Sequence, residues 1–208
     1  MSGPSTPTAS WRTGIVNLPN SLTLGRLALV PVFVVLLASG DVTQRWWALA
    51  VFVIASATDQ LDGYIARSRG LVTAFGTLAD PIADKALTLG AFVTLSALGE
   101  ITWWITVLIA VREVGITVLR AVLARRSIIP ASMGGKIKTT LQMAAIVAFL
   151  VPWASFLASA SVALTVANVL LYLALAVTVL TGVDYLVRGW RLTHRAPDPA
   201  AQASAGSR

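Results

Sequence analysis

The chain has 208 residues, of which 56% are hydrophobic and only 12% charged, and its formal net charge is +7. Soluble domains carry about a quarter charged residues, so this composition, with its mean hydropathy of +0.78, predicts an integral membrane protein. The basic residues lie mainly between or beyond apolar runs, where positive charge orients helices and attracts anionic headgroups, which argues against nucleic-acid binding. The absence of cysteine excludes disulfides, thiol catalysis and thiolate metal sites.

The two ends of the chain are rich in small and polar residues. The first residues lack the basic region and apolar core of a signal peptide, so we expect 1–16 to form a flexible cytoplasmic leader. The segment 189–208 mixes Arg, Pro, Ala and Ser and predicts a flexible cytoplasmic tail. A single membrane domain is expected over 17–188.

Six apolar runs between these ends are long enough to cross a bilayer, for which about 20 residues suffice. They lie near 21–40, 46–66, 77–99, 101–124, 139–157 and 161–187. Ahead of the first run, the mixed apolar and polar residues around Pro19 predict a short interfacial helix. The expected fold is an all-α integral membrane protein with six transmembrane helices.

The distribution of charge predicts the orientation of these spans. Six spans return both termini to one side, and of the basic residues in the joins only Arg45 falls clearly on the other side. The positive-inside rule therefore makes both termini cytoplasmic. The pairs Trp46/Trp47 and Trp103/Trp104 lie near span starts on the outer side, where aromatic anchors are expected.

Four aspartates interrupt the second and third runs. An aspartate at the centre of a membrane helix costs roughly 2.5 to 3.5 kcal/mol, so these side chains must face one another or water. Helical spacing places them on two stripes on successive antiparallel helices. The first stripe comprises Asp59, Asp62, Gly63, Ala66 and Arg67, and the second comprises Gly76, Asp80 and Asp84.

Carboxylates brought together repel one another unless positive charge compensates them. Oxygen ligands suit Mg²⁺ or Mn²⁺ rather than Zn²⁺, and a shared set can hold two ions about 4 Å apart. The small residues beside the acids leave room for a ligand, although small residues also serve helix packing. Two other interpretations stay open: pairing of the acids with Arg67, Lys85 or Arg112, and an ion or proton pathway in a transporter.

A second, basic set predicts recognition of a phosphate, by Arg forks and Lys point charges. It comprises Arg112 and Arg120 in the fourth run and Lys136 and Lys138 entering the fifth. The two lysines could instead be positive-inside flanks, like Arg125 and Arg126. Arg112 could pair locally with Glu113 or with an aspartate.

The pattern Asp-x-x-Asp-Gly-x-x-Ala-Arg, eight residues, Gly-x-x-x-Asp-x-x-x-Asp, from Asp59 to Asp84, resembles the signature of the CDP-alcohol phosphotransferase family at every fixed position. Four further segments resemble the branch that converts CDP-diacylglycerol and sn-glycerol 3-phosphate into phosphatidylglycerophosphate and CMP. They are "NLPNSLTLGRLALVP", "DPIADK", "REVGITVLR" and "SMGGKIKTTLQM". The resemblance runs from about Asn17 to Met143. It implies a homodimer in a bacterial plasma membrane, with the active site facing the cytoplasm.

The resemblance also implies a role for each matching position. Metal ions, two of Mg²⁺ or Mn²⁺, would be held by Asp59, Asp62, Asp80 and Asp84. Asp84 would also act as general base on the acceptor hydroxyl. The cytidine diphosphate would be bound by Asp59, Asp62, Gly63, Ala66, Arg67, Thr73 and Gly76. An apolar groove between helices would hold the acyl chains.

The acceptor is indicated by two positions. Branches of the family that use inositol phosphate or serine tend to show Asp-Ser after the third aspartate, whereas this chain has Asp80-Pro81. Cardiolipin synthases share Asp-Pro but typically show asparagine in place of Lys138. Glycerol 3-phosphate is therefore favoured, the same chemistry on phosphatidylglycerol or inositol phosphate is the alternative, and a cation transporter is the alternative from another class.

Overall fold

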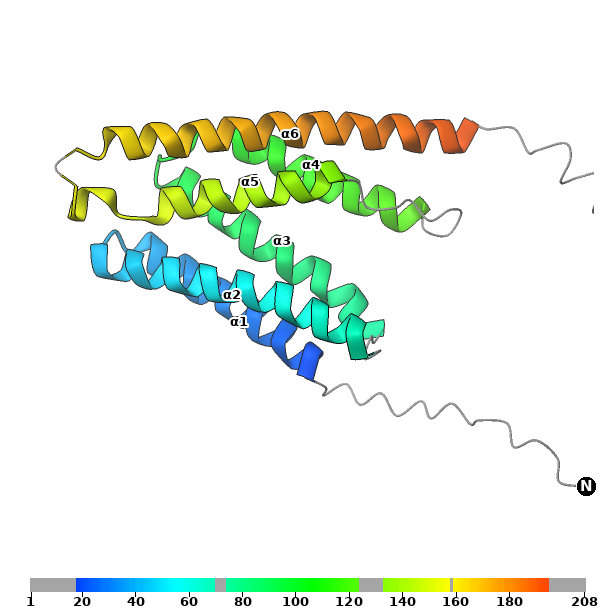
Figure 1. Ribbon diagram of the computed structural model, residues 1–208, viewed down its shortest axis with the longest axis horizontal. Helices are drawn as coiled ribbons and strands as arrows, with labels where there is room; N and C mark the ends of the chain where they lie inside the picture. The colour runs from blue at the N-terminus through cyan, green and yellow to red at the C-terminus, as the bar shows by residue number, and fades with distance from the viewer. Residues whose placement is uncertain (1–17, 70–73, 124–132, 158, 195–208) are drawn as a thin grey trace, which may run out of the picture. The chain divides into compact units, whose positions relative to one another are not determined.

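The computed structural model describes residues 18–69, 74–123, 133–157 and 159–194. Within these ranges the chain is all-helical, with six α-helices, one short 3₁₀ helix and no strand, which confirms the all-α prediction for this part of the chain (Figure 1). The elements are α1 (Leu18–Ala38), α2 (Val42–Arg69), α3 (Ala74–Ala97), α4 (Trp103–Leu123), α5 (Met133–Leu150), η1 (Trp153–Ser155) and α6 (Ser161–His194). The leader predicted over 1–16 lies outside the described residues.

Two stretches of the described chain, Gly134–Ser155 and Ser161–Val187, are long and apolar enough to cross a membrane by length and composition. The helices α1 to α6 each overlap one of the six predicted runs. The number of spans and the side on which each terminus lies stay predictions.

The helices α1 and α6 extend past the bounds expected from the sequence. The short helix expected before the first span is the beginning of α1, which runs unbroken from Leu18. Pro19 does not stop it, because proline is tolerated in the first turn, where its missing N–H has no helical partner to lose. At the other end, α6 continues to His194, past the predicted start of the tail at 189.

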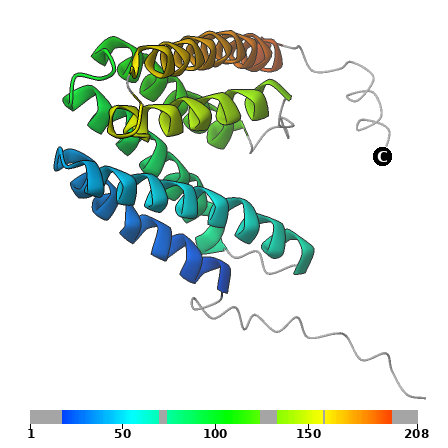
Figure 2. The same cartoon turned by 60° about the vertical axis from the view of Figure 1, so that its left-hand side comes forward.

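The chain divides into two compact units, Met1–Thr94 with Leu150–Pro152, and Leu95–Phe149 with Trp153–Arg208. In the first unit α1 and α2 lie side by side, as Figures 1 and 2 both show, and the rings of Phe33 and Phe52 join them with centroids 5.7 Å apart. Asp41 caps α2 by accepting a hydrogen bond from the Gln44 amide at 2.9 Å. Gly40, with φ of 76°, makes the left-handed turn between the two helices.

Helix α3 turns back from the end of α2, and it packs on α1 where both are apolar (Figure 1). A Cβ added at Gly90 would meet Val30 at 3.6 Å and Val34 at 3.7 Å, so the absence of a side chain brings these helices close. This unit therefore presents α2 and α3, the two helices that carry the four aspartates, as consecutive antiparallel elements.

The second unit is built from α4, α5 and α6. Helices α5 and α6 lie side by side and run in opposite directions in both views (Figures 1 and 2). Its core includes Ile105, Ile109, Ile146 and Leu171, each less than 2% exposed except Ile105 at 2%. The buried hydroxyls of Ser96 and Thr106 bind each other at 2.7 Å.

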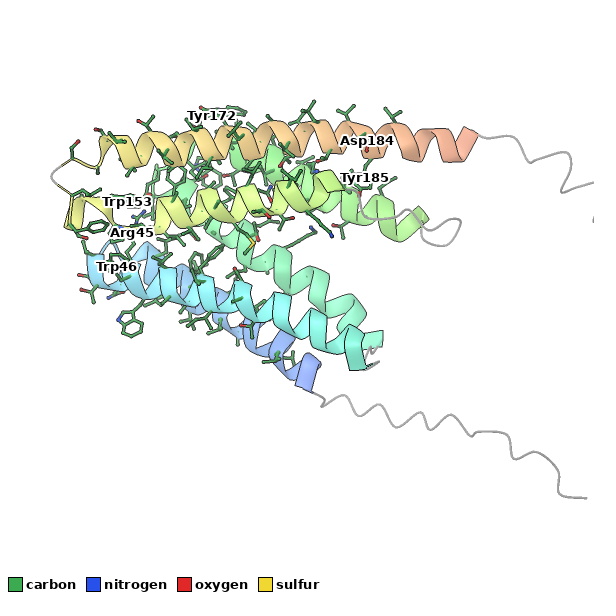
Figure 3. All side chains as sticks on the ribbon, viewed as in Figure 1. Arg45, Trp46, Trp153, Tyr172, Asp184 and Tyr185 are labelled. Atoms are coloured by element: carbon green, nitrogen blue, oxygen red, sulfur yellow. The ribbon has the colours of Figure 1, made fainter. Side chains whose placement is uncertain are left out.

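Large apolar side chains also cover the outside of the helices. Val35, Val162 and Leu180 are 69%, 73% and 70% exposed, while polar Thr178 is fully buried. Trp46, near the start of α2, is 43% exposed, and Tyr172 on α6 is 52% exposed (Figure 3). Extended apolar exposure with polar groups inside is what contact with hydrocarbon favours.

Candidate active site

The aspartates occupy α2 and α3. Asp59 and Asp62 lie on the C-terminal half of α2, and Asp80 and Asp84 on the N-terminal half of α3. Because both segments are helical, the members of each pair are separated by about one turn. Gly63, Ala66 and Arg67 follow on α2 and Gly76 precedes on α3, as the two stripes require. Their side chains, and Thr73 as a whole, lie outside what the structure describes.

The donor chemistry of this set fits a hard divalent ion. Four carboxylates on two consecutive helices supply only oxygen, the chain has no cysteine, and its one histidine, His194, ends α6. Among the side chains that the structure does describe, no group of three or more His, Cys, Asp or Glu could hold a metal. The metal centre predicted at the four aspartates lies among the side chains outside that description, so it stays a prediction.

The two lysines predicted to bind phosphate lie in different environments. Lys138 is 6% exposed, and its Nζ donates to Oε1 of Glu113 at 2.5 Å. Lys136, on the first turn of α5, is exposed. Burial of the Lys138 ammonium group against a carboxylate of another helix favours a specific contact over the interpretation of Lys138 as merely a positive-inside flank.

Arg112 binds the same carboxylate oxygen. Its Nη1 donates to Glu113 Oε1 at 3.0 Å, and the side chains of Arg112 and Glu113 are 12% and 7% exposed. The local pairing that the sequence left open is confirmed. Oε1 of Glu113 therefore accepts from Arg112 of its own helix and from Lys138 of α5, so that one carboxylate oxygen bridges the two cationic groups.

Helix α6 completes the surroundings of Arg112. The guanidinium donates from Nε to the carbonyl of Thr178 at 3.2 Å and from Nη2 to Oγ1 of Thr181 at 2.7 Å. Gln142 of α5 donates to Oγ1 of the same Thr178 at 3.2 Å. Arg112, Glu113, Lys138, Thr178 and Thr181 are called the Glu113 cluster below.

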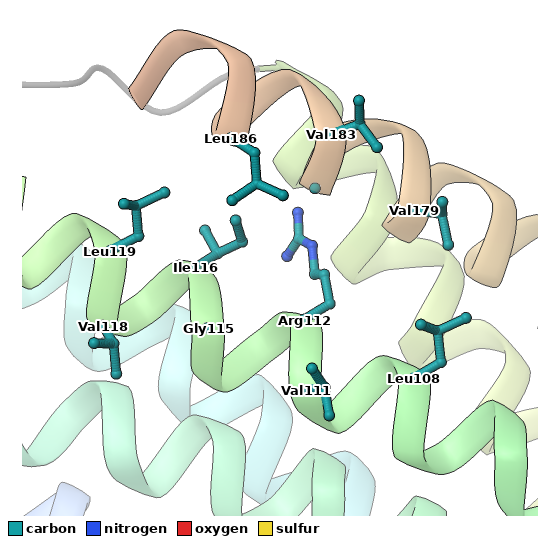
Figure 4. A pocket seen from close by; sticks show the side chains of 11 residues that line it. Leu108, Val111, Arg112, Gly115, Ile116, Val118, Leu119, Val179, Val183 and Leu186 are labelled. Atoms are coloured by element: carbon teal, nitrogen blue, oxygen red, sulfur yellow. The ribbon is translucent and has the colours of Figure 1, made fainter. Parts of the chain in front are cut away.

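An apolar groove of about 560 Å³ opens beside this cluster between α4 and α6 (Figure 4). Leu108 and Ile116 of α4 face Val179, Val183 and Leu186 of α6 across it, and the side chain of Arg112 extends from α4 towards α6 (Figure 4). The Arg112 guanidinium lies beside apolar side chains, where an unpaired charge would raise the free energy of the folded state, so it needs hydrogen-bond partners. Helix α4 supplies one of those bonds through Glu113, and α6 supplies two through Thr178 and Thr181.

Of the four predicted phosphate-binding residues, the structure brings Arg112 and Lys138 together. Arg120 follows Arg112 on α4 by about two turns, and its side chain lies outside the described set. Sequence reasoning named Glu113 only as a local partner and missed Thr178 and Thr181. The sequence did give a signal for Glu113, since acidic and basic residues inside an apolar run are usually functional and need partners.

A model of the CDP-alcohol phosphatidyltransferase family matches residues 16–180 of this chain. The chain belongs to this family. The match contains both aspartate stripes and all of the Glu113 cluster except Thr181. Members of the family are membrane-associated enzymes that generally depend on a divalent metal, in agreement with the carboxylate set.

Three relatives illustrate the extent of the similarity. The chain is 47% identical over 191 residues to "Probable phosphatidylglycerophosphate synthase" of Mycobacterium tuberculosis (strain ATCC 25618 / H37Rv), which covers 90% of this chain and 88% of the relative. It is 37% identical over 187 residues to "CDP-diacylglycerol--glycerol-3-phosphate 3-phosphatidyltransferase" of Bacillus subtilis (strain 168), covering 84% and 95% of the two chains. It is 36% identical over 176 residues to the protein of the same name from Haemophilus influenzae, covering 82% and 91%. The family resemblance predicted from the sequence is confirmed.

Proposed function

We propose that this chain transfers the phosphatidyl group of CDP-diacylglycerol to sn-glycerol 3-phosphate, forming phosphatidylglycerophosphate and CMP. The observation that carries the proposal is the buried pair of cations, Arg112 and Lys138, held on Glu113 in a chain of this family. Two cations out of water suit an acceptor that brings its own phosphate. The printed names of the relatives agree with this acceptor.

The acceptor would be bound by the basic set. Arg112 offers guanidinium donors and Lys138 a point charge, and both are already held in place when the phosphate arrives. Arg120, about two turns along α4, and exposed Lys136, at the start of α5, would supply further positive charge.

The nucleotide would lie against the two aspartate helices. The cytidine diphosphate would be held by Asp59, Asp62, Gly63, Ala66, Arg67, Thr73 and Gly76. The small residues of this set leave the helix backbones open to close approach by a ligand. Bound divalent ions, which we propose to be two of Mg²⁺ or Mn²⁺ held by Asp59, Asp62, Asp80 and Asp84, would stabilise negative charge on the diphosphate and the leaving CMP.

Asp84 is the proposed catalytic base. Its carboxylate would accept the proton of the acceptor hydroxyl as that oxygen forms a bond to the phosphorus bearing the lipid. The bond from this phosphorus to the oxygen bridging the two phosphates breaks, and CMP leaves with the bridging oxygen. The acyl chains would stay in hydrocarbon throughout, which explains why this chemistry belongs in a membrane protein.

The proposed setting is a bacterial plasma membrane. The membrane domain 17–188 would cross it six times, with both termini and the active site on the cytoplasmic side and with two copies forming a homodimer. Contact with a lipid bilayer is supported by Val35, Val162 and Leu180, which expose most of their apolar surface.

The proposal is tested by measuring CMP release from purified protein supplied with CDP-diacylglycerol and Mg²⁺. Glycerol 3-phosphate, inositol phosphate and phosphatidylglycerol are compared as acceptors, with EDTA as control. Release with glycerol 3-phosphate that EDTA abolishes is expected. Release only with another acceptor would refute the assigned substrate but keep the chemistry, and no release with any acceptor would favour the transporter.

A further inference from the structure

Glu113 is a buried carboxylate in the second unit. It is 5% exposed, and its Oε1 accepts from Lys138 of α5 and from Arg112 beside it on α4. Removing a carboxylate from water costs several kcal/mol unless cations and hydrogen bonds compensate it. The two cations therefore stabilise this buried carboxylate, and the carboxylate in turn holds both cations in place.

The charges of these three side chains do not cancel. Arg112 and Lys138 carry one positive charge each and Glu113 one negative charge, so the trio is net positive. The other groups that accept from Arg112, the Thr178 carbonyl and the Thr181 hydroxyl, are neutral. The carboxylate between the two cations offsets their mutual repulsion, and two cations brought together suit a phosphate, whose oxygens can accept from both.

The geometry also limits the movement of both cations. Arg112 is bound at Nε, Nη1 and Nη2, and Lys138 is bound to a carboxylate that Arg112 also holds. Cations fixed before the ligand arrives bind it without a further loss of side-chain entropy. Without the carboxylate, Lys138 would lose its anchor on α4.

We infer that Glu113 is the positioning residue for the acceptor phosphate: it makes no contact with the substrate and acts through Lys138 and Arg112, which it holds together. This inference rests on the proposed function. It adds a residue that recognises the acceptor indirectly.

The test uses the full chain purified in lipid and detergent, with CMP release measured against both substrates at saturating Mg²⁺. Glu113→Gln is expected to raise the KM for sn-glycerol 3-phosphate about tenfold or more, since a hydrogen bond to a charged group is worth at least that factor. The kcat and the KM for CDP-diacylglycerol are expected to stay within about twofold of wild type. Ser96→Ala, which removes the buried hydroxyl bond to Thr106 in the same unit, is the control and should change neither KM.

A double-variant comparison separates positioning from packing. In a Lys138→Met background, Glu113→Gln is expected to raise the acceptor KM by a much smaller factor than in wild type, because the group it positions is gone. If Glu113→Gln alone does not fold, the acceptor KM of the double variant is compared with that of Lys138→Met, and a difference of tenfold or more between the two would overturn the inference. A factor as large in both backgrounds, or a KM that rises equally for both substrates, would overturn the inference.

Failure of the proposed function would be visible in the wild type alone. If the wild type uses another phosphate-bearing acceptor, the same ratios are measured with that acceptor and decide the role of Glu113. If the wild type uses none, both the proposed function and the role of Glu113 are refuted. If the wild type uses glycerol 3-phosphate and Glu113→Gln leaves its KM unchanged, only the role of Glu113 is refuted.

Discussion

Replacing Gly182 by alanine adds one methyl group beneath Arg112. The new Cβ would lie 3.2 Å from Cγ of Arg112, closer than the 3.5 to 4.0 Å that two carbon atoms prefer, and 3.6 Å from its Nε, an ordinary contact distance. Arg112 must therefore move by a few tenths of an ångström, and its three hydrogen-bonded nitrogens resist this. The same substitution favours the helix by about 0.5 to 1 kcal/mol, because glycine loses more backbone entropy.

The displacement of Arg112 and the gain in helix stability can be measured separately, the first by enzyme kinetics and the second by thermal unfolding. We expect thermal stability to be unchanged or slightly higher, and the KM for sn-glycerol 3-phosphate to rise about three- to tenfold, equivalent to about 0.7 to 1.4 kcal/mol. Gly115→Ala is the matched control, since Gly115 lines the same groove and has no atom within 4 Å of an added Cβ. An acceptor KM equal to that of Gly115→Ala would refute the reasoning that the position of Arg112 controls acceptor binding.

Three further substitutions test the site. Asp84→Asn should abolish CMP release while sparing nucleotide binding, because an amide cannot take the acceptor proton; unchanged release would remove its role as base. Lys138→Asn should raise the acceptor KM about tenfold or more and exposed Lys136→Asn much less, since only Lys138 is buried on Glu113; equal effects would contradict this. Thr181→Val removes the acceptor of Arg112 Nη2 and should raise the acceptor KM alone, whereas parallel changes for both substrates would indicate a packing role.

The helices could be predicted because long apolar runs allow little else, and glycines such as Gly40 and Gly99 mark the turns. The ends were less predictable. From the sequence, Pro19 suggests an interruption of the helix, yet it lies in the first turn of α1, where proline is tolerated. The polar residues from 189 onward suggest a flexible tail, although the helix α6 continues to His194.

The aspartate stripes could be predicted because their spacing lies within single helices. The surroundings of Lys138 could not be, since a lysine near a helix start has the same sequence pattern whether it is solvated or buried. Only the packing of α4 against α5 brings Glu113 to it. Thr181 gave no signal because its hydroxyl also donates to the carbonyl of Val177 at 2.7 Å, as threonines in apolar helices commonly do.

The most direct test of the proposed activity is incorporation of labelled sn-glycerol 3-phosphate into lipid by the purified chain. The protein is supplied with CDP-diacylglycerol and Mg²⁺, and the organic and aqueous phases are then separated. We predict that label enters the organic phase as phosphatidylglycerophosphate in amounts equal to the CMP released. Label that stays entirely in the aqueous phase while CMP is released would contradict the proposed acceptor.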